Sequence, residues 1–114
     1  MADFEKQPWG RAIPYTSPTG KKTTLYNISV LAEAIGRTPQ TIRKWEIGGI
    51  IPKTPFNANG KRLYSQEHIE AIVKCAETSH IMMGSKISQT NFTEKVYREF
   101  KRINDEFFNN KEDK

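Results

Sequence analysis

The stretch TPQTIRKWEIGGIIPK, residues 38–53, places amide, hydroxyl, guanidinium and ammonium groups close together at Gln40, Thr41, Arg43 and Lys44. Arginine pairs bidentately with guanine, glutamine pairs with adenine, and threonine hydrogen-bonds a base or contacts the thymine methyl group. Lysine side chains and helix N-termini suit phosphate. The chemistry of this stretch therefore favours contact with a nucleic acid, and an ordinary solvated helix face is the alternative.

A second basic group follows in KTPFNANGKRLY, residues 53–64. Asn59-Gly60 is a strong turn signal, and the residues from Lys61 to Tyr64 return as a second strand. This segment is therefore predicted to be a small basic hairpin, or wing.

Two short helices are predicted to position these groups. Ser29 is the expected N-cap of a first helix that runs to Ile35, and Gly36 can take the left-handed conformation that stops it. Thr38 caps the next helix, with Pro39 at its first position, where the missing N–H costs nothing. Two helices joined this tightly must cross steeply, which predicts a helix-turn-helix.

The second helix would hold its polar groups on one side. Ile42 and Trp45 lie three residues apart and share a face, which predicts that both pack into the core. The four polar side chains named above project mainly from the opposite side. Gly48-Gly49 ends this helix, and Ile50-Ile51-Pro52 is expected to enter the core as a short extended run.

A third helix is expected after its N-cap, Ser65, because apolar residues follow the helical period from Ile69 to Ala76. Tyr64 precedes the cap and can form a hydrophobic staple with Ile69. That contact would fix the angle at which the hairpin enters the helix.

The last helix is predicted from about Phe92 to Phe108, and Asn91 with Glu94 resembles a capping box at its start. Its apolar stripe has four-four-three-four spacing and consists of Phe92, Val96, Phe100, Ile103 and Phe107. The stripe either completes the core of the monomer or packs against a second chain. We favour oligomerisation, because this is a large apolar surface for a terminal helix with nothing evident to pack on.

Residues 1–24 contain three prolines and are expected to form an arm or a hairpin. The hairpin alternative rests on IPYTSPTGKKTTLY, where a Pro-Thr-Gly turn separates two β-prone runs. This segment carries Arg11, Lys21 and Lys22, which either contact phosphate or stay solvated.

The composition fits one globular domain of 114 residues, with 36% hydrophobic and 27% charged residues and a net charge of +5. Residues 1–64 hold ten Lys/Arg against four Asp/Glu, whereas residues 65–114 hold eight against nine. The basic excess thus lies in the half with the predicted helix-turn-helix, which favours a polyanionic partner. No apolar run approaches a membrane span, and we expect a cytoplasmic protein.

Cys75 is the single cysteine, so it cannot form an internal disulfide. A metal site with His80 is disfavoured, because a five-residue spacing does not place both side chains on one helical face. Cys75 adjoins the apolar stripe of the third helix, which predicts a buried thiol. We expect no metal, no cofactor and no enzymatic activity, since no phosphate-cradling glycine loop or catalytic constellation is present. His68 is interpreted as a first-turn helix residue.

Four motifs follow one another in order: YxISxLA at residues 26–32, TIRKWE at 41–46, GIIP at 49–52 and GKRLYS at 60–65. Their order and spacing resemble the MerR-like winged helix-turn-helix domains. The resemblance implies a mainly α fold with a small β-hairpin wing and a C-terminal helix. The domain would span residues 25–80, with a connector at 81–91, an amphipathic helix at 92–110 and a tail at 111–114.

In that family the second helix enters the DNA major groove and the hairpin lies over flanking phosphates. The resemblance implies DNA contacts from residues of the recognition helix, namely Thr38, Gln40, Thr41, Arg43 and Lys44. It also implies contacts from the wing, namely Lys53, Lys61, Arg62 and Tyr64.

One departure is Lys44-Trp45, where full-length MerR regulators often carry two aromatic residues. This pair is closer to the recombination-accessory and phage versions of the domain. The chain also ends at Lys114, so we expect no separate effector domain and no small-molecule effector.

These observations predict a sequence-selective, double-stranded DNA-binding protein, a small transcriptional regulator of bacterial or phage type that acts as a homodimer. Within DNA binding, the alternatives are an excisionase-type accessory factor and the small terminase subunit of phage DNA packaging. From another class, the alternative is a protein-interaction adaptor that keeps the fold without binding DNA.

Overall fold

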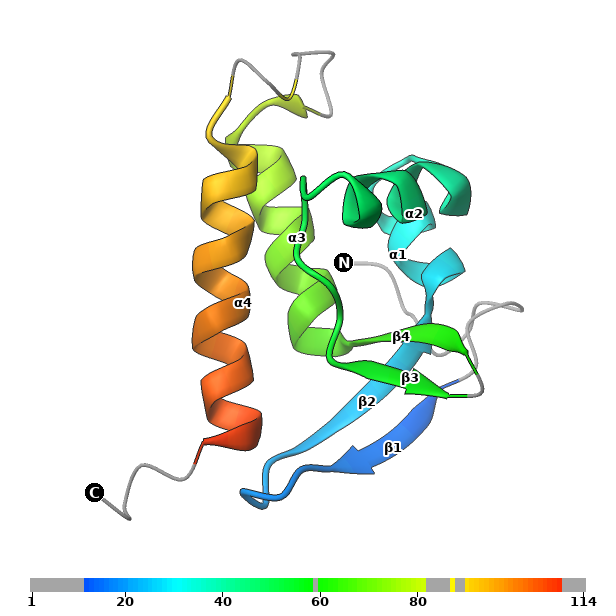
Figure 1. Cartoon of the computed structure of the whole chain (residues 1–114), viewed down its shortest axis with the longest axis vertical. Coiled ribbons are helices and arrows are strands. Elements are labelled where there is room, and N and C mark those ends of the chain that lie inside the picture. Colours follow the sequence, from blue (N-terminus) through cyan, green and yellow to red (C-terminus); the bar gives the residue numbers. More distant parts are fainter. Residues whose placement is uncertain (1–11, 59, 82–86, 88–89, 110–114) are drawn as a thin grey trace.

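The computed structural model describes residues 12–58, 60–81, 87 and 90–109, and within them four helices accompany a four-stranded sheet (Figure 1). The elements in chain order are β1 (Ile13–Thr16), β2 (Lys22–Asn27), α1 (Ile28–Ala34), α2 (Pro39–Ile47), β3 (Phe56–Ala58), β4 (Lys61–Ser65), α3 (Gln66–Thr78) and α4 (Phe92–Phe108). The winged helix-turn-helix followed by a C-terminal helix is therefore confirmed. The architecture as a whole is mixed α/β.

The sheet is larger than the predicted wing. Its strands are antiparallel in the order β1-β2-β4-β3, so the N-terminal hairpin β1–β2 joins the wing hairpin β3–β4 through β2 and β4. This confirms the hairpin alternative for the described part of residues 1–24; Arg11 lies outside the described residues. Pro14 is tolerated because β1 is an edge strand, where a missing N–H breaks no central ladder bond.

Both faces of β2 and β4 are covered. Successive strand residues point to opposite faces. Leu25 and Leu63 accordingly lie in one core cluster, which β1, β3 and the C-terminal half of α4 complete. Tyr26 and Tyr64, which are paired across the strands, lie in the other cluster, together with α1, α2 and α3. The two central strands thus separate two small cores.

The cap of α1 differs from the prediction. The helix begins at Ile28, and the Asn27 side chain accepts hydrogen bonds from the backbone N–H groups of Ser29 and Val30 at 3.0 and 3.3 Å. Asn27 and Ser29 are both good N-cap types, and the pairing of Asn27 with Leu63 in the sheet sets the earlier start. Gly36 has a φ of 69°, as expected for the residue that stops the helix.

Helix α4 packs beside α3, and its whole apolar stripe is buried inside the monomer (Figure 1). Phe92, Val96 and Phe100 lie in the core cluster that contains Tyr26 and Tyr64. Ile103 and Phe107 lie in the cluster that contains Leu25 and Leu63. This corrects the interpretation of the stripe as an oligomerisation surface, because side chains at most 1% exposed have no area left for a second chain. The stripe completes the core of the monomer, which was the other alternative considered for it.

The predicted capping box of α4 is absent. Asn91 occupies the N-cap position but makes no side-chain cap hydrogen bond. The Thr90 hydroxyl instead accepts from the backbone N–H of Phe92 at 3.2 Å.

The turn of the N-terminal hairpin meets the other end of α4. The Thr19 hydroxyl donates to the backbone carbonyl of Glu106 at 2.7 Å, so it satisfies a carbonyl that a helix C-terminus leaves free. Lys21 pairs with the Glu106 carboxylate at 3.5 Å, and its ammonium lies 5.6 Å from the centre of the Phe107 ring. Lys21 is therefore part of the fold at this end of the molecule.

His68 joins α3 to α4 through its two ring nitrogens. Nδ1 lies 2.6 Å from the Ser65 hydroxyl, and Nε2 lies 2.7 Å from the Asn104 amide oxygen. The ring is fully buried, with its centre 4.5 Å from that of Phe100. Burial lowers the pKa of His68 from 6.5 to about 4, against the opposing effect of the hydrogen bond to the Asn104 amide oxygen. From its position in the sequence, His68 was interpreted only as a first-turn helix residue, and no local pattern indicated this role.

The pH dependence of stability tests the role of His68. The pKa of His68 is about 4 in the folded state, which is below its value in the unfolded state. The contribution of neutral His68 to the free energy of unfolding is therefore complete above about pH 6.5 and is lost as the pH falls towards 4. We expect the free energy of unfolding to fall by roughly 3 kcal/mol over this range from His68 alone. Urea unfolding monitored by circular dichroism measures this.

The comparison that isolates the effect is His68→Gln, which should flatten the pH dependence between about pH 6.5 and 4. The control is His80→Asn, because His80 is exposed and has a φ of 62°, which asparagine tolerates. This control should follow the wild-type curve. Equal curves for His68→Gln and the wild type would contradict the assignment.

Candidate nucleic-acid interface

Helix α2 is held by three inward side chains, Ile42, Trp45 and Glu46. Ile42 and Trp45 are buried, as predicted from their spacing. The Trp45 ring meets Phe92 of α4 edge to face at 5.6 Å, and the Arg37 guanidinium lies 6.0 Å from the Trp45 ring centre. Arg37 also donates to the backbone carbonyl of Ile81 at 3.1 Å. The turn before α2 is therefore tied to the chain that follows α3.

The outward side of α2 carries the predicted contact residues. Gln40, Arg43 and Lys44 are exposed, and Thr41 is half-buried. Thr38 is the N-cap, as predicted, and its hydroxyl accepts from the backbone N–H of Thr41 at 3.2 Å. The primary role of Thr38 in this structure is thus to start the helix and orient its free N–H groups outward.

The glycine pair ends α2 in a specific way. Gly49 has a φ of 79°, which disfavours any other residue there, whereas Gly48 has an ordinary φ of −83°. The N–H of Ile50 returns to the carbonyl of Trp45 at 2.8 Å, and the Tyr97 hydroxyl of α4 donates to the carbonyl of Gly49 at 3.0 Å. Ile51 then enters the core, fully buried, without forming a strand. One glycine, rather than both, makes the turn.

The wing lies beside α2 and brings further cations to it. Lys53 and Lys61 are exposed, and Arg62 is half-buried. Gly60 has a φ of 77°, which fits the predicted tight turn; Asn59 lies outside the described residues. Strand β4 follows the turn directly and carries Arg62 back towards α2.

Glu46 is the residue that sequence reasoning missed. Its buried carboxylate accepts from Nε of Arg62 at 2.5 Å and from the backbone N–H of Thr54 at 3.2 Å. It therefore ties the last turn of α2 to both ends of the segment that forms the wing. A signal was present, since Glu46 lies four residues after Ile42 and so shares its inward face. A carboxylate at a core-facing position requires a partner.

Tyr64 was predicted to contact DNA, and the structure corrects this. The side chain is fully buried in the core between the sheet and the helix-turn-helix, so no part of it reaches a nucleic acid. Burial raises the pKa of Tyr64, and the Glu46 carboxylate raises it further. The nearby cations of Arg62 and Arg43 oppose that rise. Tyr64 is thus a core residue whose hydroxyl is influenced by the charges of these three side chains.

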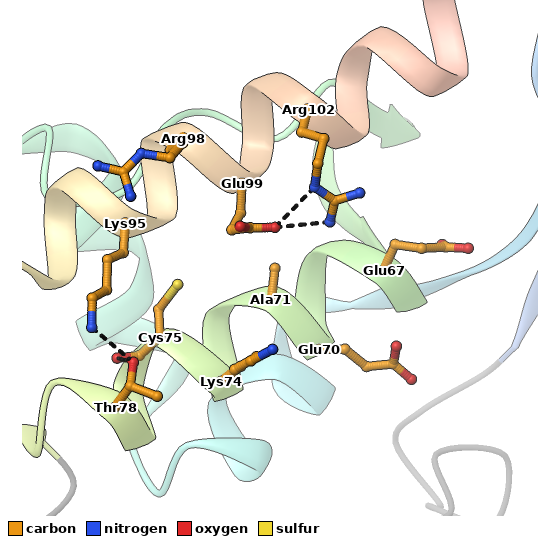
Figure 2. Close-up of a pocket in the computed structure, with 10 residues that line it drawn as sticks. All are labelled: Glu67, Glu70, Ala71, Lys74, Cys75, Thr78, Lys95, Arg98, Glu99 and Arg102. Atoms are coloured by element: carbon orange, nitrogen blue, oxygen red, sulfur yellow. Dashed lines mark hydrogen bonds and ion pairs between the residues drawn. The ribbon is translucent and has the colours of Figure 1, made fainter.

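A groove of about 430 Å³ between α3 and α4 offers a different kind of surface (Figure 2). Its cations are Lys74, Lys95, Arg98 and Arg102, and its carboxylates are Glu67, Glu70 and Glu99. Glu99 binds Arg102 at 2.8 Å, and Lys95 donates to Thr78 at 3.0 Å, so part of this charge is already neutralised or bonded. Cys75 also lines this groove but is 5% exposed, as predicted for a structural thiol, and burial raises its pKa.

The contrast between the two surfaces locates the candidate interface. Within the part of the chain that the structure describes, the exposed cations of α2 and the wing make no ion pair with a carboxylate; they are Arg43, Lys44, Lys53 and Lys61. The one acidic side chain of α2, Glu46, is buried. A polyanion is attracted to the first surface and meets three carboxylates on the second. A helix-turn-helix with an exposed basic second helix and an adjoining hairpin defines the winged helix-turn-helix class of DNA-binding domain.

The comparison with protein families agrees with this class. Residues 26–77 match the family described as MerR HTH family regulatory protein, so this segment is a MerR HTH family domain. Such a domain implies DNA binding and transcriptional regulation, and regulators of this family are typically non-enzymatic. Neither the curated proteins nor the solved structures gave a match. Among the described residues, no helix is both long enough and apolar enough to cross a bilayer.

Proposed function

We propose that this protein is a sequence-selective, double-stranded DNA-binding transcriptional regulator of bacterial or phage type that acts in the cytoplasm. Helix α2 lies in the major groove, and the hairpin β3–β4 lies over the flanking backbone. Gln40, Thr41, Arg43 and Lys44 face the bases and nearest phosphates, and the wing contributes Lys53, Lys61 and Arg62. The observation that carries this proposal is the exposed cationic side of α2 next to a basic hairpin, within a MerR HTH domain.

The roles within this surface follow from side-chain chemistry. Arg43 has a planar fork that pairs with guanine, and Gln40 offers the donor and acceptor that adenine requires. Lys53 and Lys61 are flexible point charges, which suit phosphate. Thr38 acts through the helix it caps, because its hydroxyl is engaged with Thr41.

A homodimer is part of the proposal, because a two-fold protein matches a palindromic duplex site. The stripe of α4 is buried within the monomer, so a second chain must pack on other surfaces. Sedimentation tests this directly. A dimer fits the regulator, whereas a ring-sized assembly would favour the small terminase subunit instead.

Selection from a random duplex pool, followed by footprinting, tests the function. We expect one enriched sequence, a protected site with two-fold symmetry, and an affinity that falls steeply as salt rises, because counterions are released on binding. Absence of duplex binding even at low salt would contradict the proposal and favour the protein-interaction adaptor.

Two alanine substitutions distinguish base reading from phosphate contact. Arg43→Ala should weaken binding to the selected site by about 1–3 kcal/mol and relax preference at one position. Lys61→Ala should weaken binding to all sequences alike and lower the salt slope by about 1. Titration of fluorescent duplexes at several salt concentrations measures both effects.

The matched control is Lys101→Ala, which removes the same charge from an exposed lysine, 81% exposed, on α4. It should change affinity least, because Lys101 lies on the helix away from the proposed interface. If Arg43→Ala and Lys101→Ala reduced affinity equally at every sequence, α2 would not be the reading helix.

A further inference from the structure

The connection between α2 and the wing is made by one buried carboxylate. The side chain of Glu46 is 5% exposed, whereas that of its partner Arg62 is 30% exposed. The carboxylate is shared, since Oε1 accepts from Nε of Arg62 and Oε2 accepts from the backbone N–H of Thr54. Thr54 in turn donates its hydroxyl to the carbonyl of Leu63, the residue after Arg62. Glu46 is therefore bonded to both sides of the hairpin.

This arrangement leaves the outer edge of Arg62 available. Glu46 contacts the guanidinium only at Nε, and no hydrogen bond joins the two terminal nitrogens to any described residue. Arg62 lines a hollow of about 270 Å³ together with Lys53, Thr54, Asn57 and Gly60. An arginine that is bonded only at Nε still presents its two terminal NH2 groups in one plane, and this geometry matches phosphate oxygens.

The same carboxylate also lies close to the proposed base-reading residue. Arg43 and Glu46 are three residues apart on α2, so they project from neighbouring positions of one helix. The charges of these two groups and of Arg62 influence the pKa of the buried Tyr64 hydroxyl. Glu46 is therefore bonded to Arg62 and lies one helical turn from Arg43 on α2.

We propose that Glu46 is a positioning residue: it holds Arg62 by Nε, so that the outer nitrogens of Arg62 face a DNA backbone phosphate when α2 occupies the major groove. This inference rests on the proposed function. By its negative charge alone, the Glu46 carboxylate would weaken the binding of DNA. By positioning Arg62, it would instead strengthen that binding.

The two possible roles of Glu46 predict changes in duplex affinity of opposite sign, so one substitution distinguishes them. If Glu46 acted only through its charge, Glu46→Gln would raise the affinity for duplex, because one negative charge near the phosphates is removed. If Glu46 positions Arg62, the same substitution lowers affinity by about tenfold, a typical size for coupled neighbours. The salt slope should also fall by about 1, because one phosphate contact is lost.

The experiment measures duplex affinity at several salt concentrations for the wild type, Glu46→Gln, Arg62→Gln and the double variant. If Glu46 acts through Arg62, Glu46→Gln causes no further loss in the Arg62→Gln background. The control is Glu77→Gln, which removes the same charge from an exposed side chain on α3 and should bind as the wild type does. Circular dichroism establishes that each variant is folded at the temperature of the titration.

A second variant keeps the proposal testable if Glu46→Gln does not fold. Arg62→Lys retains the positive charge and a partner for Glu46, but one ammonium cannot present a fixed planar fork to phosphate while bound to the carboxylate. We expect weaker binding and a salt slope lower by about 1. Unchanged affinity in Arg62→Lys would overturn the proposal.

The outcomes separate this inference from the proposed function. No duplex binding by the wild type removes the function, and the inference fails with it. Wild-type binding together with unchanged or tighter binding by Glu46→Gln leaves the function standing and overturns the role of Glu46. A loss of equal size in the Arg62→Gln background would mean that Glu46 does not act through Arg62, which also overturns it.

Discussion

A nine-residue helix that points its cations outward must be held in place by the few side chains it points inward, and α2 depends on this constraint. Isolated helices of this length are unstable in water, so tertiary packing has to supply the order. Ile42 and Trp45 supply apolar contact, and Glu46 supplies a paired carboxylate. These three residues determine where Gln40 and Arg43 lie.

Two inward side chains of α2 connect it to different parts of the molecule. Trp45 meets Phe92 at the start of α4, and Glu46 meets Arg62 in the wing. Helix α4 then runs beside α3 and ends near the N-terminal hairpin (Figure 1), where Thr19 and Lys21 contact its last turn. The segments before and after the MerR HTH domain therefore complete the core that supports the interface.

Much of the fold could be predicted because its signals are local. Thr38-Pro39, Gly36 and Ser65 mark helix ends through cap chemistry, and the structure bears out all of them. The pairing of β2 with β4 has no local signal, since it joins residues far apart in the sequence. Without that pairing, an arm and a hairpin both remained open for residues 1–24, and Asn27 was missed as the cap of α1.

The errors at the site have the same physical origin. Tyr64 was assigned to DNA by resemblance, but both faces of β4 are covered, so two successive residues, Leu63 and Tyr64, are buried. The stripe of α4 was assigned to a second chain because a periodic pattern shows that a face is buried without showing what covers it. Glu46 was predictable as an inward position, but its partner Arg62, sixteen residues away, was not.

The most direct measurement of the central claim is an NMR titration of the ¹⁵N-labelled protein with a duplex chosen by selection. We predict the largest amide shift changes in the first turns of α2 and in the residues around Gly60, with the groove between α3 and α4 little affected. Changes concentrated on α3 and α4, with α2 unmoved, would contradict it.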